Sequence, residues 1–329
     1  MNGLDNEKLI ELYEVMLKIR KYEEKIGEIY YEGKKPFDIA KGPIPGELHL
    51  SSGQESSAAG LCIHLKKEDA VIGTHRAHNF AIAKGVDLKR MTAEIFGKST
   101  GLSNGKGGHM HLFDPSVNFS CSGIVGASFP QALGVGIASK FENKDYVAIA
   151  VGGDGAANQG TFAESLNLAA LWSLPVIFLI ENNGWAISVA KNKSTAGNIC
   201  DRAKAYGIPA ECIDGENVID VYKSSKIAID RARKGFGPTV LEIMVSRLRG
   251  HFEGDPQIYR SQEDFDIAKS KDPVLKFESY LLENNILNHQ QIQAISEKVD
   301  LIINEAIEFA RKSDYPKPSE ALENVFYGG

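Results

Sequence analysis

The sequence has few cysteines, no excess of basic residues and no long apolar run. Its four cysteines, Cys62, Cys121, Cys200 and Cys212, lie far apart, with no Cys-x-x-Cys pair and no histidine pair at zinc spacing beside them. This pattern is typical of a reduced compartment. Because 37 Lys and Arg stand against 43 Asp and Glu, a formal net charge of −6, the composition favours neither nucleic acid nor an anionic membrane as a partner.

The sequence also lacks a segment that would cross or enter a membrane. Its longest apolar stretch, residues 168–180, is interrupted by Ser173 and Pro175 and is shorter than the roughly 18 residues that a span requires. The first residues, MNGLDNEKLIEL, contain acids and no basic leader followed by an apolar run. These features predict a cytoplasmic protein without a processed leader.

Helices are predicted at both ends of the chain. Apolar residues recur at steps of three and four over residues 6–31 and again over 292–310. Asp272 followed by Pro273 is a typical helix start. Small residues over 54–63 predict a close-packed helix, whereas KGPIPGELHLSSG, residues 41–53, predicts a loop.

Residues 97–136 are unusually rich in glycine, with nine glycines among forty residues. A solvated flexible linker is one interpretation. Apolar residues such as Met110, Phe113 and Ile124 are interleaved with the glycines, however, and a linker has no need of them. We therefore expect a loop that folds against a ligand.

The centre of the chain predicts a parallel sheet. Two continuous apolar runs, VAIAV at 147–151 and PVIFLI at 175–180, flank a helix-forming segment at 160–172. Strands buried on both faces and joined by a helix form a βαβ unit. The fold class is therefore predicted as α/β, a mostly parallel central sheet flanked by helices. We divide the chain into an N-terminal helix and loop extension (1–45), an α/β domain (46–260) and a C-terminal helical extension (261–329).

Polar residues follow both predicted strands. GGDGAANQG follows the first strand and ENNGW follows the second, so Asp154 and Asn183 are 183 − 154 = 29 residues apart. If the strands are neighbours, as right-handed crossovers favour, both side chains emerge at the same edge of the sheet. A carboxylate oxygen, an amide oxygen and a main-chain carbonyl suit Mg²⁺, which keeps its other positions for phosphates and water.

The residues around Asp154 also suit an anion. Gly153 and Gly155 allow a close approach of the backbone, and the helix after Ala156 offers free amides to negative charge. The alternative is that Gly-Asp-Gly and Asn-Asn-Gly are two ordinary turns. Their occurrence on consecutive buried strands at this spacing favours a diphosphate with Mg²⁺ instead.

These motifs resemble those of a known family. Gly153-Asp154-Gly155 with Asn182-Asn183 resembles the thiamine diphosphate motif, and GDGAANQGTFAESLNLAALWSLPVIFLIENN resembles the alpha subunits of the decarboxylating components of 2-oxo acid and acetoin dehydrogenases. The similarity extends from about Arg20 to Pro318. It implies thiamine diphosphate and magnesium as cofactors and the thiamine diphosphate-binding fold.

The resemblance also implies roles for individual residues. Asp154, Asn183 and the carbonyl of Trp185 match the metal ligands. The residues that match the cofactor-binding positions are His75, Arg76, Gly123, Ile124, Val125, Gly153, Asp154, Gly155, Ala156 and Asn183, with Gly126 closing the loop that begins at Gly123. His251 in RGHFEGD and His49 in GELHLSSGQE match active-site histidines. For His109 and His111 the functional and structural interpretations are balanced, whereas His64 and His289 are expected to be structural or surface residues.

The partner chains that we expect follow from a residue that this chain lacks. The resemblance requires a glutamate at the aminopyrimidine ring of the cofactor, and no motif here supplies it. A separate beta subunit is therefore expected to supply it, in an assembly of two alpha and two beta chains that passes the acyl group to a lipoyl-bearing acyltransferase. His75-Arg76 and GHFEGD at 250–255 resemble the acetoin-type chains, so we expect acetoin to be the substrate, followed by pyruvate and then branched-chain 2-oxo acids.

Two other functions fit the sequence less well. A nicotinamide dehydrogenase needs Gly-x-Gly-x-x-Gly after a strand, and Gly153 to Asn158 lacks the third glycine and places an acid beside the phosphate. A non-catalytic assembly subunit would have no need of Asp154, Asn183, Arg76 and His251, all of which are present. The thiamine diphosphate interpretation is therefore preferred.

Overall fold

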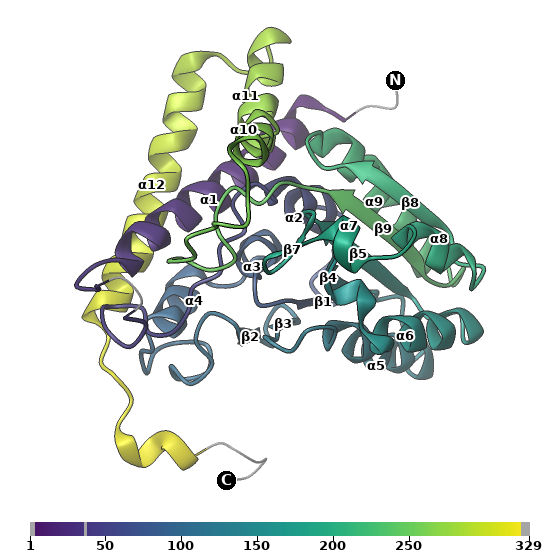
Figure 1. Cartoon of the computed structure of the whole chain (residues 1–329), viewed down its shortest axis with the longest axis horizontal. Coiled ribbons are helices and arrows are strands. Elements are labelled where there is room, and N and C mark those ends of the chain that lie inside the picture. The colour runs from purple at the N-terminus through teal and green to yellow at the C-terminus, as the bar shows by residue number, and fades with distance from the viewer. Residues whose placement is uncertain (1–3, 36–37, 324–329) are drawn as a thin grey trace.

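The structure is a computed structural model of the chain, and it describes residues 4–35 and 38–323. Within these residues, seven strands form one sheet in the order β2-β3-β1-β4-β5-β9-β8 (Figure 1). Neighbouring strands run parallel except β2 and β3, which are antiparallel. The predicted α/β fold with a mostly parallel sheet is confirmed. The strands of the sheet are Ala70–Gly73 (β1), Phe113–Asp114 (β2), Phe119–Cys121 (β3), Ala148–Gly153 (β4), Val176–Asn182 (β5), Ala210–Asp214 (β8) and Thr239–Met244 (β9).

The predicted βαβ unit is present. Strand β4 leads through a 3-10 turn, Ala156–Asn158, and helix α6, Gly160–Leu171, to strand β5, which pairs with β4 in parallel. Both strands extend about two residues further than the apolar runs alone predicted, so that Gly153 pairs with Glu181. The residues before Asp154 and Asn183 therefore belong to the sheet and fix where these two side chains begin.

The sheet is covered by helices on both faces, because successive strand residues point to opposite sides. Ile149 and Val151 pack in the core on one face, with residues of α1, α2, α4, α9 and α12. Ala148 and Ala150 pack in the core on the other face, with residues of α5, α6 and α8. A strand buried on both faces needs apolar residues at every position, which is why these runs are continuous.

The helical extensions at the two ends of the chain pack on one another. Helix α1 contacts both α11 and α12, and Figure 1 shows α1 and α12 side by side along one flank of the molecule. The side chain of Asp272 caps α11 as predicted. The helices are Asn6–Tyr30 (α1), Glu55–Cys62 (α2), His78–Lys84 (α3), Leu88–Ile95 (α4), Ser128–Phe141 (α5), Gly160–Leu171 (α6), Lys191–Ser194 (α7), Ile199–Lys204 (α8), Val218–Arg233 (α9), Gln262–Ser270 (α10), Pro273–Glu283 (α11) and His289–Lys312 (α12), with a second 3-10 turn at Pro318–Leu322.

One part of the glycine-rich prediction was wrong. Residues 128–136 belong to helix α5 and not to a loop. Helix α5 packs against the sheet through Phe129, Ala132 and Leu133. Gly136 lies so close to β5 that a Cβ there would be 2.9 Å from Val176 Cγ2. Gly136 therefore serves close packing of a helix, which composition alone does not distinguish from a loop.

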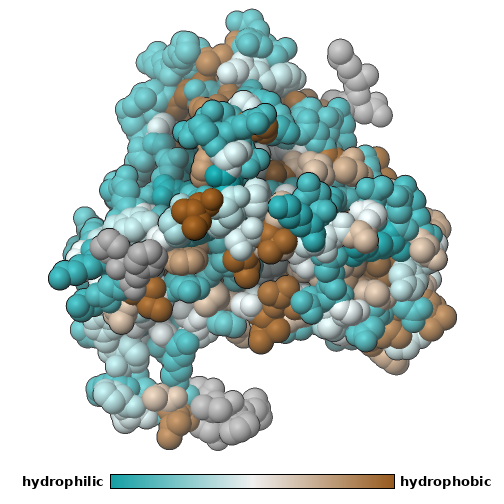
Figure 2. Space-filling view, in the orientation of Figure 1, coloured by the Kyte–Doolittle hydropathy of each residue, from teal (hydrophilic) through white to brown (hydrophobic). Residues whose placement is uncertain are grey.

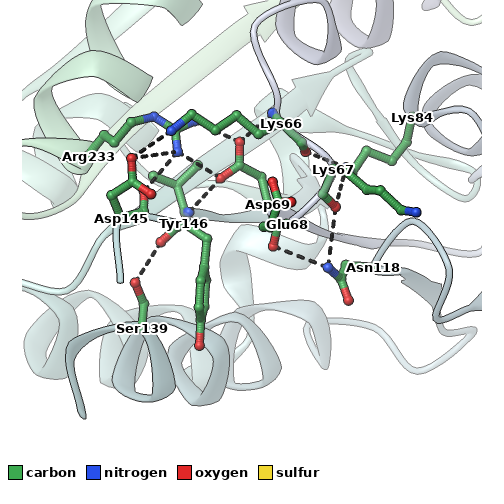
Figure 3. A network of polar contacts seen from close by, with 11 residues as sticks. Lys66, Lys67, Glu68, Asp69, Lys84, Asn118, Ser139, Asp145, Tyr146 and Arg233 are labelled. Atoms are coloured by element: carbon green, nitrogen blue, oxygen red, sulfur yellow. Dashed lines mark hydrogen bonds and ion pairs between the residues drawn. The ribbon is translucent and has the colours of Figure 1, made fainter. Parts of the chain in front are cut away.

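An ion network fixes the amino ends of the central strands, opposite the cavity described below (Figure 3). The buried carboxylate of Asp69 accepts hydrogen bonds from the backbone N–H of Val147, at 2.8 Å, and from Arg233 Nη2, at 2.7 Å. Arg233 also donates to the carbonyl oxygen of Asp145. These bonds tie the segment before β1 to the start of β4 and to the end of α9.

The surface carries no broad apolar band in the view of Figure 2, where apolar groups form separate patches among hydrophilic ones. The described residues include no helix that is both long enough and apolar enough to span a bilayer.

Candidate active site

A cavity of about 510 Å³ opens at the carboxyl edge of the sheet, beside the ends of β1, β4 and β5. In the sheet order, the chain leaves β1 toward β2 and β3 on one side, and it leaves β4 toward β5 on the other side. Such a point of divergence is where open α/β sheets bind ligands. Every residue predicted for the site lines this cavity: His49, His75, Arg76, Gly123, Ile124, Val125, Gly153, Asp154, Gly155, Ala156, Asn183, Trp185 and His251.

Asp154 carries a carboxylate that the protein leaves incompletely paired. The residue is 1% exposed, and within the described chain its Oδ2 has no hydrogen-bond partner. Burial raises the pKa of Asp154 above its ordinary value, and backbone N–H groups of Asp154 and Asn183 offset this only in part. A buried, unpaired carboxylate oxygen is costly unless a cation or proton meets it. The donor set therefore fits a hard divalent cation.

Asn183 is oriented by its neighbours. Its amide Nδ2 donates to Gln54 Oε1 over 2.9 Å, and its Oδ1 accepts the backbone N–H of Trp185 at 3.1 Å. An amide oxygen has two lone pairs, so Oδ1 keeps one for a further partner. The Trp185 ring packs against Tyr259 with centroids 5.3 Å apart. Because an indole N–H donates and does not accept, the main-chain carbonyl is the group that Trp185 can offer to a metal.

The backbone after β4 is shaped by glycine. A Cβ on Gly155 would lie 2.8 Å from the Cβ of Ala186, which belongs to the small hairpin of β6 (Trp185–Ala186) and β7 (Val189–Ala190). Only glycine allows that approach. The turn Ala156–Asn158 follows, and the first amides of a helical turn are not used within it.

Two arginines line the cavity, and neither pairs with a carboxylate in the described chain. Arg76 donates through Nη1 to Leu50 O and through Nη2 to His251 O, the latter at 2.8 Å. Arg247 donates to Ile187 O at 3.1 Å and to the hydroxyl of Tyr259 at 2.8 Å. Burial, with the neighbouring charge of Arg247, lowers the pKa of Arg76 to about 10, so the side chain stays cationic at neutral pH.

The backbone at the Arg247 contact is unusual. Ile187 has φ of 56°, a left-handed conformation that β-branched residues rarely adopt. Its carbonyl thereby accepts from both terminal nitrogens of Arg247. Two buried cations in one cavity favour an anionic ligand.

The loop from Gly123 to Gly126 presents apolar side chains at the cavity. Ile124 is 70% exposed and Val125 is 52% exposed, which is unusual for large aliphatic residues beside a cavity. Gly126 has φ of +83°, and a Cβ there would lie 2.8 Å from Thr161 Oγ1. The glycine is therefore required by both conformation and space.

Three of the predicted histidines form one cluster. The ring centroid of His49 lies 4.7 Å from that of His75 and 4.8 Å from that of His251, and the centroids of His75 and His251 are 5.5 Å apart. Burial lowers the pKa of His75 to about 3 and that of His251 to about 4, with Arg76 adding to both shifts, and it lowers the pKa of His49 further. The three imidazoles are therefore neutral at neutral pH.

Of four other histidines, one lies beside this cluster and three lie outside it. His109 is buried, and its Nε2 lies 3.3 Å from Nδ1 of His49, so it belongs to the wall behind the cluster. His111 lies near Gly123 and is exposed. His64 packs against the ring of Tyr222 in a tilted arrangement and contacts its carbonyl. His289 is exposed at the start of α12.

Sequence reasoning missed Gln54, Glu181 and Arg247 as lining residues. Glu181 is buried, and its carboxylate accepts from Gln54 Nε2 at 3.2 Å, from Asn79 Nδ2 at 3.0 Å and from the Ser57 hydroxyl. Burial raises its pKa to about 7. An acid placed directly before Asn182-Asn183, in an otherwise apolar strand, was a usable signal for Glu181, whereas Gln54 and Arg247 carried none.

The chain is similar to known proteins over nearly its whole length. A family model described as "Dehydrogenase E1 component" matches residues 32–319. The chain is 42% identical over 327 residues to the alpha subunit of acetoin:2,6-dichlorophenolindophenol oxidoreductase from Bacillus subtilis, covering 98% of this chain and 95% of that protein. The Cupriavidus necator protein of the same name is 41% identical over 326 residues, with the same coverage. The alpha subunit of the pyruvate dehydrogenase E1 component from Zymomonas mobilis is 38% identical over 328 residues, covering 98% and 90%.

Proposed function

The chain belongs to the dehydrogenase E1 component family, and from that premise we propose that it is the alpha subunit of a thiamine diphosphate- and Mg²⁺-dependent enzyme that cleaves acetoin. The observation that carries the proposal is the pairing of opposite charges in one cavity. Asp154 offers an unpaired carboxylate oxygen, and Arg76 and Arg247 offer two cations without carboxylate partners in the described chain. A magnesium diphosphate satisfies both.

The metal end of the cofactor is assigned to the carboxyl edge of β4 and β5. Asp154 Oδ2, Asn183 Oδ1 and the carbonyl of Trp185 would hold Mg²⁺, with diphosphate oxygens and water in its other positions. The backbone of Gly153, Gly155 and Ala156 would face the diphosphate. Arg76 and Arg247 would neutralise its remaining charge, as guanidinium groups do when they donate to phosphate oxygens.

The ring end of the cofactor is assigned to the loop of Gly123, Ile124 and Val125 and to His75. The exposed aliphatic side chains of Ile124 and Val125 would be covered by the ring system, which removes apolar surface from water. Thiamine diphosphate supplies carbanion stabilisation when bound, and the protein supplies orientation and electrostatics.

His251 and His49 are assigned to the reacting end. Their rings are neutral at neutral pH because burial lowers the pKa of each, and a neutral imidazole is able to accept a proton or donate one from its N–H. Main-chain bonds hold His251 in place: its N–H donates to Asp255 Oδ2 at 2.8 Å and its carbonyl accepts from Arg76. We assign to it the handling of the acyl group on its way to lipoamide.

A beta subunit completes the site in this proposal. Glu181 is the one buried carboxyl group besides Asp154 that lines the cavity in the described chain, and its oxygens are already used by Gln54, Ser57 and Asn79. Three donors already hold it, so we do not assign to it the contact with the aminopyrimidine ring. We assign that role to a glutamate of the beta subunit, in an assembly of two alpha and two beta chains that serves a lipoyl-bearing acyltransferase.

The choice of acetoin as substrate rests on the charges in the cavity. Acetoin has no carboxylate, and the histidine cluster offers no cation at neutral pH. Both arginines already donate to carbonyl groups and are assigned to the diphosphate. The similarity to two acetoin oxidoreductase alpha subunits supports the same choice. Pyruvate is the second candidate, because the alpha subunit from Zymomonas mobilis is nearly as similar, and branched-chain 2-oxo acids are the third.

The test is reduction of 2,6-dichlorophenolindophenol by this chain together with its beta subunit, thiamine diphosphate and Mg²⁺. Acetoin should be the best substrate, pyruvate and branched-chain 2-oxo acids should be slower, and the chain without the beta subunit should be inactive. A preference for a 2-oxo acid would contradict the acetoin assignment but not the cofactor site. Full activity of the chain by itself would contradict the assignment of the glutamate to a partner.

A further inference from the structure

His49, His75 and His251 form a cluster of imidazoles in the cavity, separate from the oxygen ligands assigned to Mg²⁺. One ring nitrogen from each of the three histidines lies within 4.8 Å of the others. We propose that these three imidazoles bind a divalent transition metal ion such as Zn²⁺ or Co²⁺, at a site separate from the oxygen ligands assigned to Mg²⁺. The site has three protein ligands and opens into the cavity, so a fourth position is left for water or a carboxylate.

The nitrogens of two of the rings are free of protein partners. His251 is held through its backbone N–H and its carbonyl, and its ring makes no hydrogen bond to any described residue. The ring of His75 likewise has no hydrogen bond within residues 4–35 and 38–323. A metal ion would therefore replace water at these nitrogens and break no bond of the protein.

The third ring is oriented by a neighbour outside the cluster. Nδ1 of His49 lies 3.3 Å from Nε2 of His109, so Nε2 of His49 remains for the metal. Metal-binding histidines characteristically use their second nitrogen in this way, because the contact fixes the ring and its tautomer. His109 is itself buried, which restricts the movement of the pair.

The charges around the cluster have opposite effects on a bound cation. Arg76 and Arg247 lie near His251 and disfavour a cation there. Glu47 opposes them, since its Oε2 lies 3.9 Å from Nε2 of His49 and its side chain lines the same cavity. A carboxylate at that place is able to complete the coordination of a metal on three histidines.

The ligand type decides which ion binds. Imidazole nitrogens favour Zn²⁺, Co²⁺, Ni²⁺ and Cu²⁺, whereas Mg²⁺ prefers oxygen. The nitrogen cluster and the oxygen set at Asp154 therefore select different ions. A transition metal on the cluster would occupy space that the proposed function gives to the ring end of the cofactor, and this consequence rests on that function.

Cobalt is the probe, because its visible absorption reports coordination. The full chain, freed of metal and without thiamine diphosphate, is titrated with Co²⁺. A single saturable site should give the strong absorption of four- or five-coordinate Co²⁺. His75→Gln and His251→Gln should each raise the dissociation constant roughly a hundredfold, since loss of even an outer-shell partner costs about 10- to 100-fold. Circular dichroism of each variant confirms that it is folded.

Control variants separate this site from others. His111→Gln changes an exposed histidine on the neighbouring loop, and Asp154→Ala removes the oxygen site; both should keep the cobalt spectrum. The proposal is overturned if the wild-type chain gives only the weak absorption of six-coordinate Co²⁺, or if the spectrum survives in His75→Gln and His251→Gln. Loss of the signal in Cys212→Ser would overturn it too, because Cys212 is an exposed thiol.

A second experiment tests the exclusion of the cofactor. With the beta subunit present, Zn²⁺ at about ten times its own dissociation constant should raise the apparent Kd for thiamine diphosphate roughly tenfold by competition. An unchanged Kd overturns the exclusion. If thiamine diphosphate fails to bind even without Zn²⁺, the proposed function fails, whereas the cobalt result stands independently.

Discussion

Asn183 donates its side-chain amide to Oε1 of Gln54 over 2.9 Å, and this bond determines which atom of Asn183 is available to a ligand. With Nδ2 engaged, the oxygen Oδ1 is the atom that remains for the cavity. Gln54 also donates to Glu181, so one side chain connects the loop before α2 to two residues at the end of β5. The orientation of a proposed metal ligand thus depends on a residue far away in the sequence.

Gln54→Leu tests this relationship. The variant keeps the size of the side chain and removes both hydrogen bonds, so the Asn183 amide is free to rotate. Mg²⁺-dependent binding of thiamine diphosphate should weaken about tenfold or more, as measured by calorimetry with the beta subunit present. Gln131→Leu, at an exposed position of α5, should leave binding unchanged. Equal affinities in both variants would show that Asn183 needs no such support.

Asp154→Asn tests the cation site with little change of shape. Cofactor binding that depends on Mg²⁺ should be lost, because an amide replaces the carboxylate. The melting temperature of the cofactor-free chain should stay the same or rise, since burial destabilises the unpaired carboxylate. Asp201→Asn, on an exposed carboxylate, serves as the control. A marked loss of stability without cofactor would indicate a structural role for Asp154 instead.

Arg247→Gln tests the residue that sequence reasoning missed. Removing one of two buried cations should weaken binding of both thiamine diphosphate and inorganic pyrophosphate about 30-fold, which corresponds to roughly 2 kcal/mol. Competition binding with Mg²⁺ present measures both ligands. Arg90→Gln changes an exposed arginine and should have no effect. A loss confined to thiamine diphosphate would place Arg247 at the ring end and not at the diphosphate.

His251→Gln tests the assignment at the reacting end. Cofactor affinity should change little, whereas the rate of acyl transfer to lipoamide should fall by about 100-fold, within the usual range for a proton-transferring side chain. Stopped-flow and steady-state assays distinguish binding from turnover. His289→Gln, an exposed histidine on α12, is the matched control. Unchanged turnover would remove His251 from the catalytic residues.

Glu181 should make stability depend on pH. Burial raises its folded pKa to about 7 from 4.5, so between these values the folded chain holds a proton that the unfolded chain has lost. The free energy of unfolding should therefore fall as pH rises from about 4.5 to 7, by roughly 3 kcal/mol at most. Urea unfolding of the metal-free chain at pH 5 and pH 8 measures this, and Glu181→Gln should reduce the difference. The same pH dependence in the variant would contradict the raised pKa.

Local patterns were sufficient for the central fold. The two apolar runs around residues 147–151 and 175–180 predicted β4, β5 and their parallel pairing, because strands buried on both faces need apolar residues throughout. The spacing of apolar residues predicted α1 and α12. Helix α5 was missed because composition alone does not show whether a glycine stands in a turn or, like Gly136, against a strand.

The sequence by itself determined the type and order of the polar residues that follow β4 and β5, since the end of a strand and the turn after it are encoded locally. Only the tertiary structure decided which other residues lie beside these polar residues. Gln54, Arg76, His49 and Arg247 come from segments up to about 200 residues apart, and no local pattern specifies that they share one cavity. Burial of the carboxylates and imidazoles, which sets their pKa values, likewise arises only when distant elements pack together.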